Sequence, residues 1–213
     1  MSLIQNVATV RESIARTGRN PDDITIVAVT KGFGIGTCRT ALAAGLTVLG
    51  ENRVQEALTK MEEVHGGEWH LIGHLQSNKV KLASGRFALI QSVDTPRLAE
   101  HIAGIEPRQK VLVEVNISRE PQKSGVPLES AVDAIEVIAR LLDVRGVMAV
   151  GPTHGDPAES FRALKRIHDE AEQRTGAPLP IISMGMSGDF EAAVAAGSTM
   201  LRLGQALFGP RPA

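Results

Sequence analysis

The sequence contains no tyrosine, one tryptophan and one cysteine, Cys38, among its 213 residues. The lack of tyrosine excludes every mechanism that needs a phenolic acid or base from this chain. A single cysteine cannot form an internal disulfide, and no run of 18 apolar residues occurs that could cross a membrane. The opening segment is interrupted by Gln5, Asn6 and Arg11, where a signal peptide needs an unbroken apolar stretch. We therefore expect a cytoplasmic protein that is not attached to a membrane.

Net charge is also nearly absent, because 23 Lys and Arg residues stand against 24 Asp and Glu residues. A formal net charge of −1 creates no global field that would gather nucleic acid or an anionic membrane. Any anion that the protein binds must be held locally. No stretch of Pro, Gly or Ser is long enough to be a linker, so residues 1–213 are expected to form one domain.

Short apolar or β-branched runs alternate with segments whose apolar positions have helical spacing. The eight predicted strands are 24–30, 46–49, 69–72, 87–91, 111–115, 144–149, 180–183 and 200–203. The predicted helices between them include 53–64, 97–105, 128–142, 158–174 and 190–196. Asp94 and Asp189 are expected to cap helix N-termini. Glycines follow three of these helices, at Gly66, Gly176 and Gly197.

The strand runs are apolar on successive residues, as in ITIVAV and VLVEV, which suits strands covered on both faces. Parallel sheets built from βα units have this property, and eight strands favour a closed (β/α)8 barrel, a TIM barrel of the α/β class. The alternative is an open doubly wound sheet with a glycine-rich turn after its first strand. Gly32 and Gly34 follow the first strand, but Thr37 stands where the third glycine of the dinucleotide-binding pattern belongs.

In a parallel barrel, functional side chains lie just beyond the carboxyl ends of the strands. The polar or glycine residues at those places are Lys31, Glu51, Asn52, His74, Gln76, Asn78, Asn116, Ser183, Gly185, Ser187, Arg202 and Gly204. His70 and His74 are four residues apart, without an HExxH pattern or a cysteine partner. No metal site is expected from this spacing.

Lys31 ends the first predicted strand, where a lysine must either extend to water or accept a partly desolvated pocket that lowers its pKa. A neutral amine can condense with an aldehyde to form a Schiff base, which is how lysines hold pyridoxal phosphate (PLP) or activate sugars. Taken alone, the residue favours the simpler interpretation, a lysine that reaches to solvent.

Two turns of small residues could hold a phosphate group. The segment SMGMSGDF places Ser187 before a predicted helix whose free N–H groups and positive dipole end favour anions. The turn at Gly204 and Gln205 follows the last strand and could present backbone N–H groups to the same anion. Each turn alone also fits capping and close packing, but together they favour a phosphate site.

Arg202 lies within the apolar run TMLRLG, where a permanent cation needs a partner. That strand offers no acidic residue. Two interpretations stay open for the guanidinium: a buried salt bridge to another element, or donation to a ring nitrogen or a phosphate of a ligand.

Taken together, these motifs resemble the YggS/PROSC family of PLP-binding homeostasis proteins, whose barrel is similar to the N-terminal domain of alanine racemase. The segments that carry the resemblance span nearly the whole chain: AVTK, GENRVQEA, WHLIGHLQSNK, SVD, VNIS, KSG, GVMAV, SMGMS and GSTMLRLGQALFG. The resemblance implies a cofactor site made of Lys31, Asn52, Ser183, Met184, Gly185, Ser187, Arg202, Gly204 and Gln205.

In that site Lys31 would hold PLP as a Schiff base, and Ser187 with the turn at Gly204 would bind the phosphate. Arg202 would face the pyridine nitrogen, and Asn52 would lie beside the cofactor ring. Residues 184–186 would form a wall of the site. A threonine is common in the family where this chain has a glutamine at position 205.

An arginine opposite the pyridine nitrogen disfavours protonation of the ring and weakens the electron-sink chemistry of PLP. Alanine racemase uses two opposed bases, a lysine and a tyrosine of its second domain, and this chain has no tyrosine. We therefore expect a protein of PLP homeostasis with little or no catalytic activity, whose candidate partners besides PLP are PLP-dependent apoenzymes. A closed barrel has no exposed sheet edge, so we expect a monomer.

Two alternatives remain at this point. The chain could be an amino-acid racemase that takes its second base from a partner. It could also be a barrel aldolase that uses Lys31 on a sugar phosphate, in which case the purified protein would be colourless rather than yellow.

Overall fold

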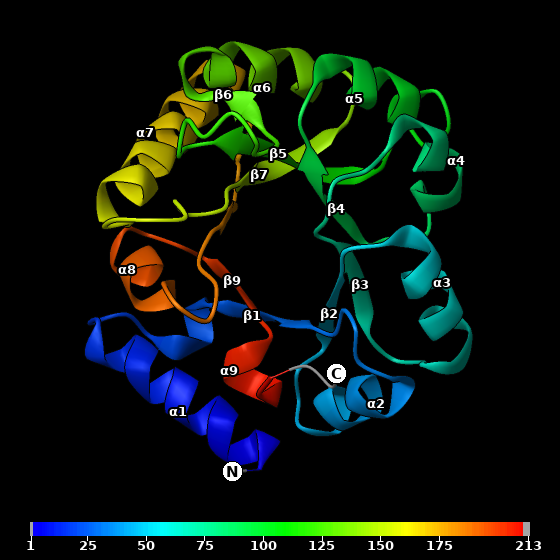
Figure 1. Ribbon diagram of the computed structural model, residues 1–213. Helices are drawn as coiled ribbons and strands as arrows, with labels where there is room; N and C mark the ends of the chain where they lie inside the picture. The colour runs from blue at the N-terminus through cyan, green and yellow to red at the C-terminus, as the bar shows by residue number, and fades with distance from the viewer. Residues whose placement is uncertain (1, 211–213) are drawn as a thin grey trace.

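The computed structural model describes residues 2–210, which form a barrel of parallel strands surrounded by helices (Figure 1). The strands are β1 (Thr25–Val29), β2 (Val48–Glu51), β3 (Glu68–Leu71), β4 (Leu89–Val93), β5 (Lys110–Asn116), β6 (Val126–Pro127), β7 (Asp143–Met148), β8 (Ile181–Ser183) and β9 (Met200–Leu203). The helices are α1 (Leu3–Arg16), α2 (Ile35–Ala43), α3 (Val54–Glu63), α4 (Val80–Ala83), α5 (Pro96–Ala103), α6 (Ala131–Ala139), α7 (Ala158–Thr175), α8 (Phe190–Ala195) and α9 (Gln205–Phe208). Short 3-10 helices lie at Pro21–Asp23, Ser77–Lys79 and Leu128–Ser130.

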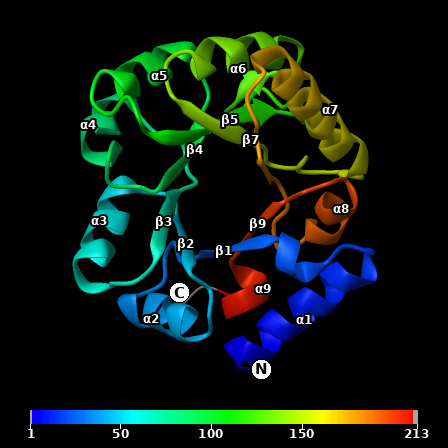
Figure 2. The same ribbon diagram turned by 180° about the vertical axis from the view of Figure 1, so that it is seen from behind.

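Eight of these strands close into the barrel. Hydrogen-bonded neighbours follow the order β4-β3-β2-β1-β9-β8-β7-β5, and the additional pairing of β4 with β5 completes the circuit. The short strand β6 pairs with the end of β5 and lies outside the circuit. The predicted (β/α)8 barrel is confirmed, and each predicted strand overlaps one strand of the barrel. The helices ring the strands in Figures 1 and 2, except α9, which lies within the ring near α1.

The five predicted helices correspond to α3, α5, α6, α7 and α8, and α1, α2, α4 and α9 lie outside the predicted set. Helix α1 begins with a capping box, in which the Ser2 hydroxyl accepts from the Gln5 N–H and the Gln5 side chain accepts from the Ser2 N–H. Helix α2 has the sequence IGTCRTALA, whose glycine and threonines interrupt the apolar spacing of a helix. In residues 2–210, every helix is too short or too polar to cross a bilayer.

Of the two predicted caps, Asp94 is at the wrong position. Helix α5 begins at Thr95, whose hydroxyl accepts a hydrogen bond of 3.2 Å from the Leu98 N–H. The carboxylate of Asp94, the predicted cap, instead lies with Oδ2 3.1 Å from Nδ1 of His74.

The C-terminus of α7 agrees with the sequence prediction. Gly176 ends this helix in the left-handed conformation, with a φ of 65°.

Apolar side chains fill two regions, one on each face of the barrel wall. The larger cluster packs between the strands and the surrounding helices and includes the fully buried Phe161, Ile135 and Leu164. The smaller cluster lies inside the barrel and takes one residue from each of six strands: Val27, Val48, Leu89, Leu112, Met148 and Met200. Since successive side chains alternate between the two faces, strands buried on both faces read as continuous apolar runs.

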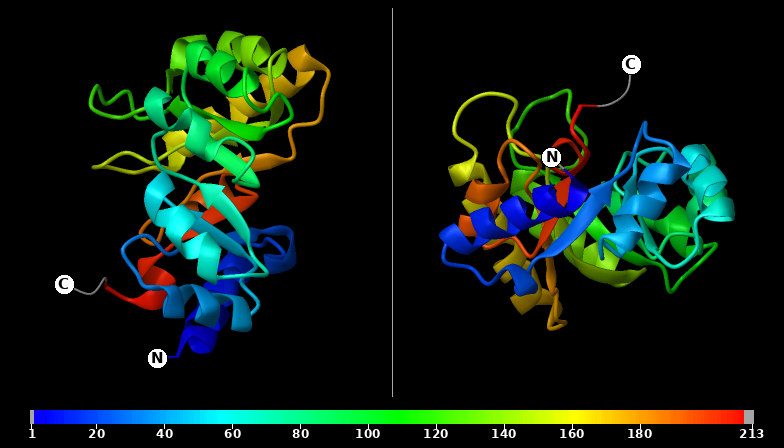
Figure 3. Two further views of the ribbon diagram at one scale, coloured as in Figure 1. Left: turned by 90° about the vertical axis from the view of Figure 1, so that its right-hand side faces the viewer. Right: turned by 90° about the horizontal axis from the view of Figure 1, so that it is seen from below.

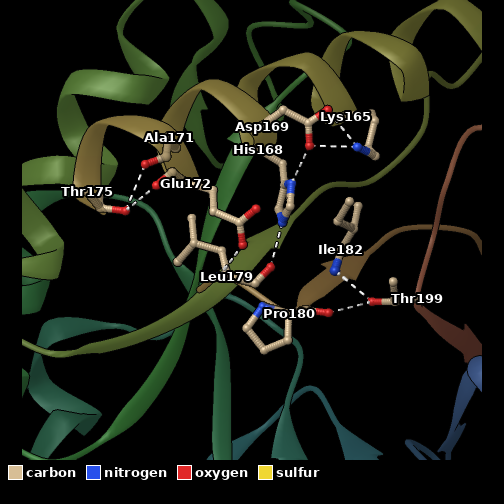
Figure 4. Close-up of polar contacts among 10 residues, drawn as sticks. All are labelled: Lys165, His168, Asp169, Ala171, Glu172, Thr175, Leu179, Pro180, Ile182 and Thr199. Carbon is tan, nitrogen blue, oxygen red and sulfur yellow. Dashed lines mark hydrogen bonds and ion pairs between the residues drawn. The ribbon is translucent and has the colours of Figure 1, made fainter. Parts of the chain in front are cut away.

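Hydrogen bonds tie the last turns of α7 to the segment that leads into β8 (Figure 4). His168 Nε2 lies 2.5 Å from the Leu179 carbonyl oxygen, and the Leu179 N–H donates to the Glu172 carboxylate at 2.7 Å. The Ile182 N–H donates to the Thr199 hydroxyl at 2.9 Å, which joins β8 to the start of β9. These contacts join β8 and the segment before it to α7 on one side and to the start of β9 on the other.

The carboxyl ends of the parallel strands lie on one side of the barrel. Figure 3 shows the loops after β5 and after β7 extending from the same side as α9. Any site at the carboxyl ends is therefore bordered by these loops.

Candidate functional site

A cavity of about 670 Å³ opens at the carboxyl ends of the strands, among the loops that follow β1, β2, β8 and β9. Its volume falls within the range of about 300–1,000 Å³ that is typical of small-molecule sites. Its described lining residues are Val29, Lys31, Phe33, Asn52, Ile72, Val150, Met186, Ser187, Gly188, Arg202, Gly204, Gln205, Gly209 and Pro210. The cavity thus has apolar walls and a few polar groups that converge on it.

Six of the nine residues predicted for the cofactor site line this cavity: Lys31, Asn52, Ser187, Arg202, Gly204 and Gln205. The other three, Ser183, Met184 and Gly185, are buried behind the lining. The side chain of Met184 is fully buried in the core, whereas Met186 is 39% exposed and lines the cavity. Of the expected wall at residues 184–186, the structure therefore places only Met186 at the cavity.

Gly185 has a structural reason to be glycine. Its φ is +100°, which favours glycine, and a Cβ atom there would lie 2.7 Å from the Ala193 side chain and 2.8 Å from that of Leu201. Close packing of β8 and β9 against α8 thus requires a residue without a side chain at this position.

Lys31 lies two residues beyond the end of β1, and the partly buried lysine borders the cavity. The chain turns at the next residue, because Gly32 has a φ of +75°. The Phe33 ring packs against Phe208 with centroids 5.4 Å apart, which joins this turn to α9. Lys31 is the one lysine among the described residues that line the cavity.

Arg202 lies on β9 with 5% of its surface exposed, at the floor of the cavity. Its Nη1 donates to the backbone oxygen and the hydroxyl of Ser183, at 2.8 and 2.7 Å, and its Nη2 donates to the Ala149 carbonyl at 2.7 Å. These bonds use at most three of the five N–H donors of a guanidinium, and no hydrogen bond from the other two is found within residues 2–210.

Of the two interpretations that the sequence leaves open for Arg202, the salt bridge is not found, because no carboxylate in residues 2–210 lies within 4.0 Å of its nitrogens. Burial lowers the pKa of Arg202 to about 10, and the nearby charges of Glu114 and Asp189 oppose this change. The guanidinium therefore stays charged at neutral pH and is held by carbonyl and hydroxyl oxygens rather than by a counter-ion.

A chain of hydrogen bonds continues from Arg202 across the barrel interior. The Ser183 hydroxyl donates to Gln91 Oε1 at 2.7 Å, and Gln91 Nε2 lies 3.0 Å from His70 Nδ1. Burial lowers the pKa of His70 to about 4, so this imidazole is neutral at physiological pH. Ser183 and His70 therefore support the floor of the cavity and do not line it.

Ser187, which also lines the cavity, joins the loop that follows β8 to α9. Its hydroxyl oxygen accepts from the Ala206 N–H at 3.0 Å, which leaves its own proton available to an acceptor in the cavity. A Cβ atom placed on Gly188 would meet nothing within 4 Å, so the backbone there faces open space. Asp189 stands at the N-cap position of α8, but its carboxylate accepts from the Met186 N–H at 2.6 Å instead of from the helix.

The chain is similar to known proteins over nearly its whole length. Residues 2–212 match the family model of the alanine racemase N-terminal domain. The pyridoxal phosphate homeostasis protein of Deinococcus radiodurans is 41% identical over 214 residues, which cover 98% of this chain and 100% of that protein. This chain belongs to the pyridoxal phosphate homeostasis protein family. The resemblance inferred from the motifs is confirmed.

Two solved structures have the same fold as this chain. The structure of PipY from Synechococcus elongatus PCC7942 with PLP bound has a TM-score of 0.84 and 34% identity, and covers 98% of this chain and 100% of that chain. Alanine racemase from Corynebacterium glutamicum has a TM-score of 0.79 at 16% identity, and the match covers 99% of this chain and 60% of that one. The second likeness shows the fold alone, a barrel like that of the racemase N-terminal domain.

Glu114 is a residue of this family member that sequence reasoning missed. It lies on β5 with 8% of its surface exposed and borders a cavity of about 130 Å³, which shares Val150 with the larger one. Burial, reinforced by the charge of Asp94, raises the pKa of Glu114 to about 7, and Arg202 opposes the rise. The alternation in VLVEV could have revealed it, since Glu114 shares a face with Leu112 of the interior cluster.

Proposed function

We propose that this member of the family binds PLP in the cavity at the carboxyl ends of the strands, and that Lys31 forms the covalent bond to it. When bound, PLP supplies an aldehyde carbon with which an amine can condense. The observation that carries the proposal is the convergence on one cavity of a single lysine, a buried guanidinium and a hydroxyl beside open glycine backbone. The PLP-bound structure of the relative PipY supports it.

The residues present fit the chemical groups of PLP. Ser187, Gly188 and Gly204 would hold the phosphate, through the hydroxyl proton and backbone N–H groups. The free donors of Arg202 would face the ring nitrogen and keep it unprotonated, and Asn52 would lie beside the ring. The apolar walls would exclude water from the two faces of the ring.

The proposal includes little or no catalytic activity. Apart from Lys31 and Arg202, the described lining residues carry no titratable side chain, and the sequence has no tyrosine. Racemisation by two opposed bases would lack its second base. The protein would instead hold PLP and release it to PLP-dependent apoenzymes.

We also propose that the protein is cytoplasmic and monomeric. The lone buried cysteine supports the cytoplasmic location, and the closed barrel, which has no exposed sheet edge, supports the monomer.

Borohydride reduction of the PLP-loaded protein is expected to place a pyridoxyl group on Lys31 and to remove the yellow colour. Mass mapping of the reduced protein gives the position of the group. Lys31→Ala is expected to abolish both the colour and the label while the protein stays folded. Lys81→Ala, at an exposed lysine of α4, is the matched control and should behave like the wild type. A label on another lysine of the native protein would contradict the proposal.

The loaded protein is also expected to leave the optical rotation of L-alanine unchanged, because the described lining residues include one amine base, Lys31, and no second base. Free PLP at the same concentration is the control. Loss of optical rotation faster than in that control would favour the racemase alternative.

A further inference from the structure

A network of charged side chains surrounds the backbone next to Lys31, outside the cavity. The ammonium of Lys60, on α3, donates to the carbonyl oxygen of Thr30 at 2.8 Å. The same ammonium donates to the carboxylates of Glu51, at 2.6 Å, and Glu56, at 2.8 Å. The side chains of Lys60 and Glu51 are 6% and 0% exposed, so most of the network is shielded from water.

The two carboxylates also bind the backbone segment directly. The Thr30 hydroxyl donates to Glu51 Oε1 at 2.6 Å. On the other side of Lys31, the Gly32 N–H donates to Glu56 Oε1 at 2.8 Å. The residues before and after Lys31 are thus both bonded to one network, of which Lys60 and Glu51 are buried and Glu56 is partly exposed.

A contribution to folding stability does not by itself explain why Glu51, Glu56 and Lys60 lie next to this backbone segment. Oε2 of Glu51 is buried and has no hydrogen-bond partner in the part of the chain that the structure describes. A buried carboxylate oxygen without a partner costs free energy, and buried ion pairs are often no more stabilising than apolar residues of similar volume. A role in placing the Lys31 backbone accounts for the network better.

We propose that Glu51, Glu56 and Lys60 are positioning residues, which hold the backbone of Lys31 so that its amine meets an aldehyde in the cavity. The inference rests on the proposed function, covalent binding of PLP at Lys31. In that step the amine nitrogen forms a double bond to the aldehyde carbon, and its two protons leave with the carbonyl oxygen as water. A fixed backbone restricts the amine to the torsions of its own side chain, which raises the fraction of productive geometries.

The test compares PLP with pyridoxine 5′-phosphate, which has an alcohol in place of the aldehyde. Both compounds report the ring and phosphate contacts, but only PLP can bond to Lys31. Lys60→Met is expected to weaken the binding of PLP by roughly 10- to 100-fold and to leave the affinity for pyridoxine 5′-phosphate unchanged. The ratio of the two affinities, measured by calorimetric titration of apo protein, is the readout, since a general folding defect lowers both together.

Because Lys60 is buried, a second pair of variants uses Glu56, whose side chain is 29% exposed. Glu56→Ala is expected to lower the same ratio, and Glu56→Gln is expected to restore it, because a glutamine oxygen can still accept from the Gly32 N–H. Glu62→Ala, at an exposed residue of the same helix, is the matched control and should keep the wild-type ratio.

A wild-type ratio in both Lys60→Met and Glu56→Ala would overturn the positioning role, and so would an equal loss of both affinities. Either result leaves the labelling of Lys31 in the wild-type protein intact. Labelling of a different lysine would instead overturn the proposed function, so the two failures are distinguishable.

Discussion

Pyridoxal is expected to bind this protein about 100-fold or more weakly than PLP does. A hydrogen bond to a charged acceptor contributes about 1.5–3 kcal/mol, so losing two of them corresponds to a factor of this size. Ser187 and the glycine backbone at Gly188 and Gly204 border the same cavity as Lys31 and would provide these donors. Titration of apo protein with each aldehyde, followed by the absorbance of the covalent adduct, measures the difference.

Ser187→Ala extends this test to a single donor. It is expected to weaken the binding of PLP by roughly 10- to 100-fold, because one hydroxyl is lost while the backbone donors remain. The affinity of the variant for pyridoxal is the internal control and should not change. Equal affinity of the wild-type protein for the two aldehydes would show that the phosphate does not bind at Ser187. The only role left for Ser187 would then be its structural hydrogen bond to the Ala206 N–H.

Arg202→Met is expected to lower the free energy of unfolding of the apo protein by roughly 3–5 kcal/mol. The guanidinium donates to the carbonyl oxygens of Ser183 and Ala149 and to the Ser183 hydroxyl, and methionine would remove all three bonds; the Ser183 carbonyl oxygen would keep only the Ala149 N–H, at 3.0 Å. Urea unfolding of the apo protein measures the loss. Arg145→Met, on β7, is the matched control, because its side chain is 40% exposed and should change stability little.

A carboxylate at position 202 should be more damaging still. Arg202→Glu would turn an acceptor toward the oxygens of Ser183 and Ala149, and it would add a negative charge near Glu114 and Asp189. This variant is therefore expected not to fold. Wild-type stability of Arg202→Met would show that the three hydrogen bonds of Arg202 are not needed for the fold.

Several features were readable from the sequence because they depend on local order along the chain. Strands buried on both faces produce continuous apolar runs, so eight runs in alternation with helical patterns predict a closed barrel. The rule that functional groups follow the carboxyl ends of strands then singles out Lys31, Asn52 and Ser187 as members of one site. Helix α2 escaped prediction because a glycine and two threonines interrupt its apolar spacing, whereas α1 was missed although the Ser2 and Gln5 capping box marks its start in the sequence.

Other features arise only when the barrel closes, since they join residues that are far apart in the sequence. The sequence alone determined that this is a parallel α/β barrel with a lysine and two small-residue turns at one end. Only the tertiary structure decided that Arg202 is held by carbonyl oxygens of Ser183 and Ala149, and that Lys60 reaches Thr30. The physical reason is that barrel closure and strand register determine which buried polar groups come into contact. The spacing of residues along the chain does not predict these long-range pairs.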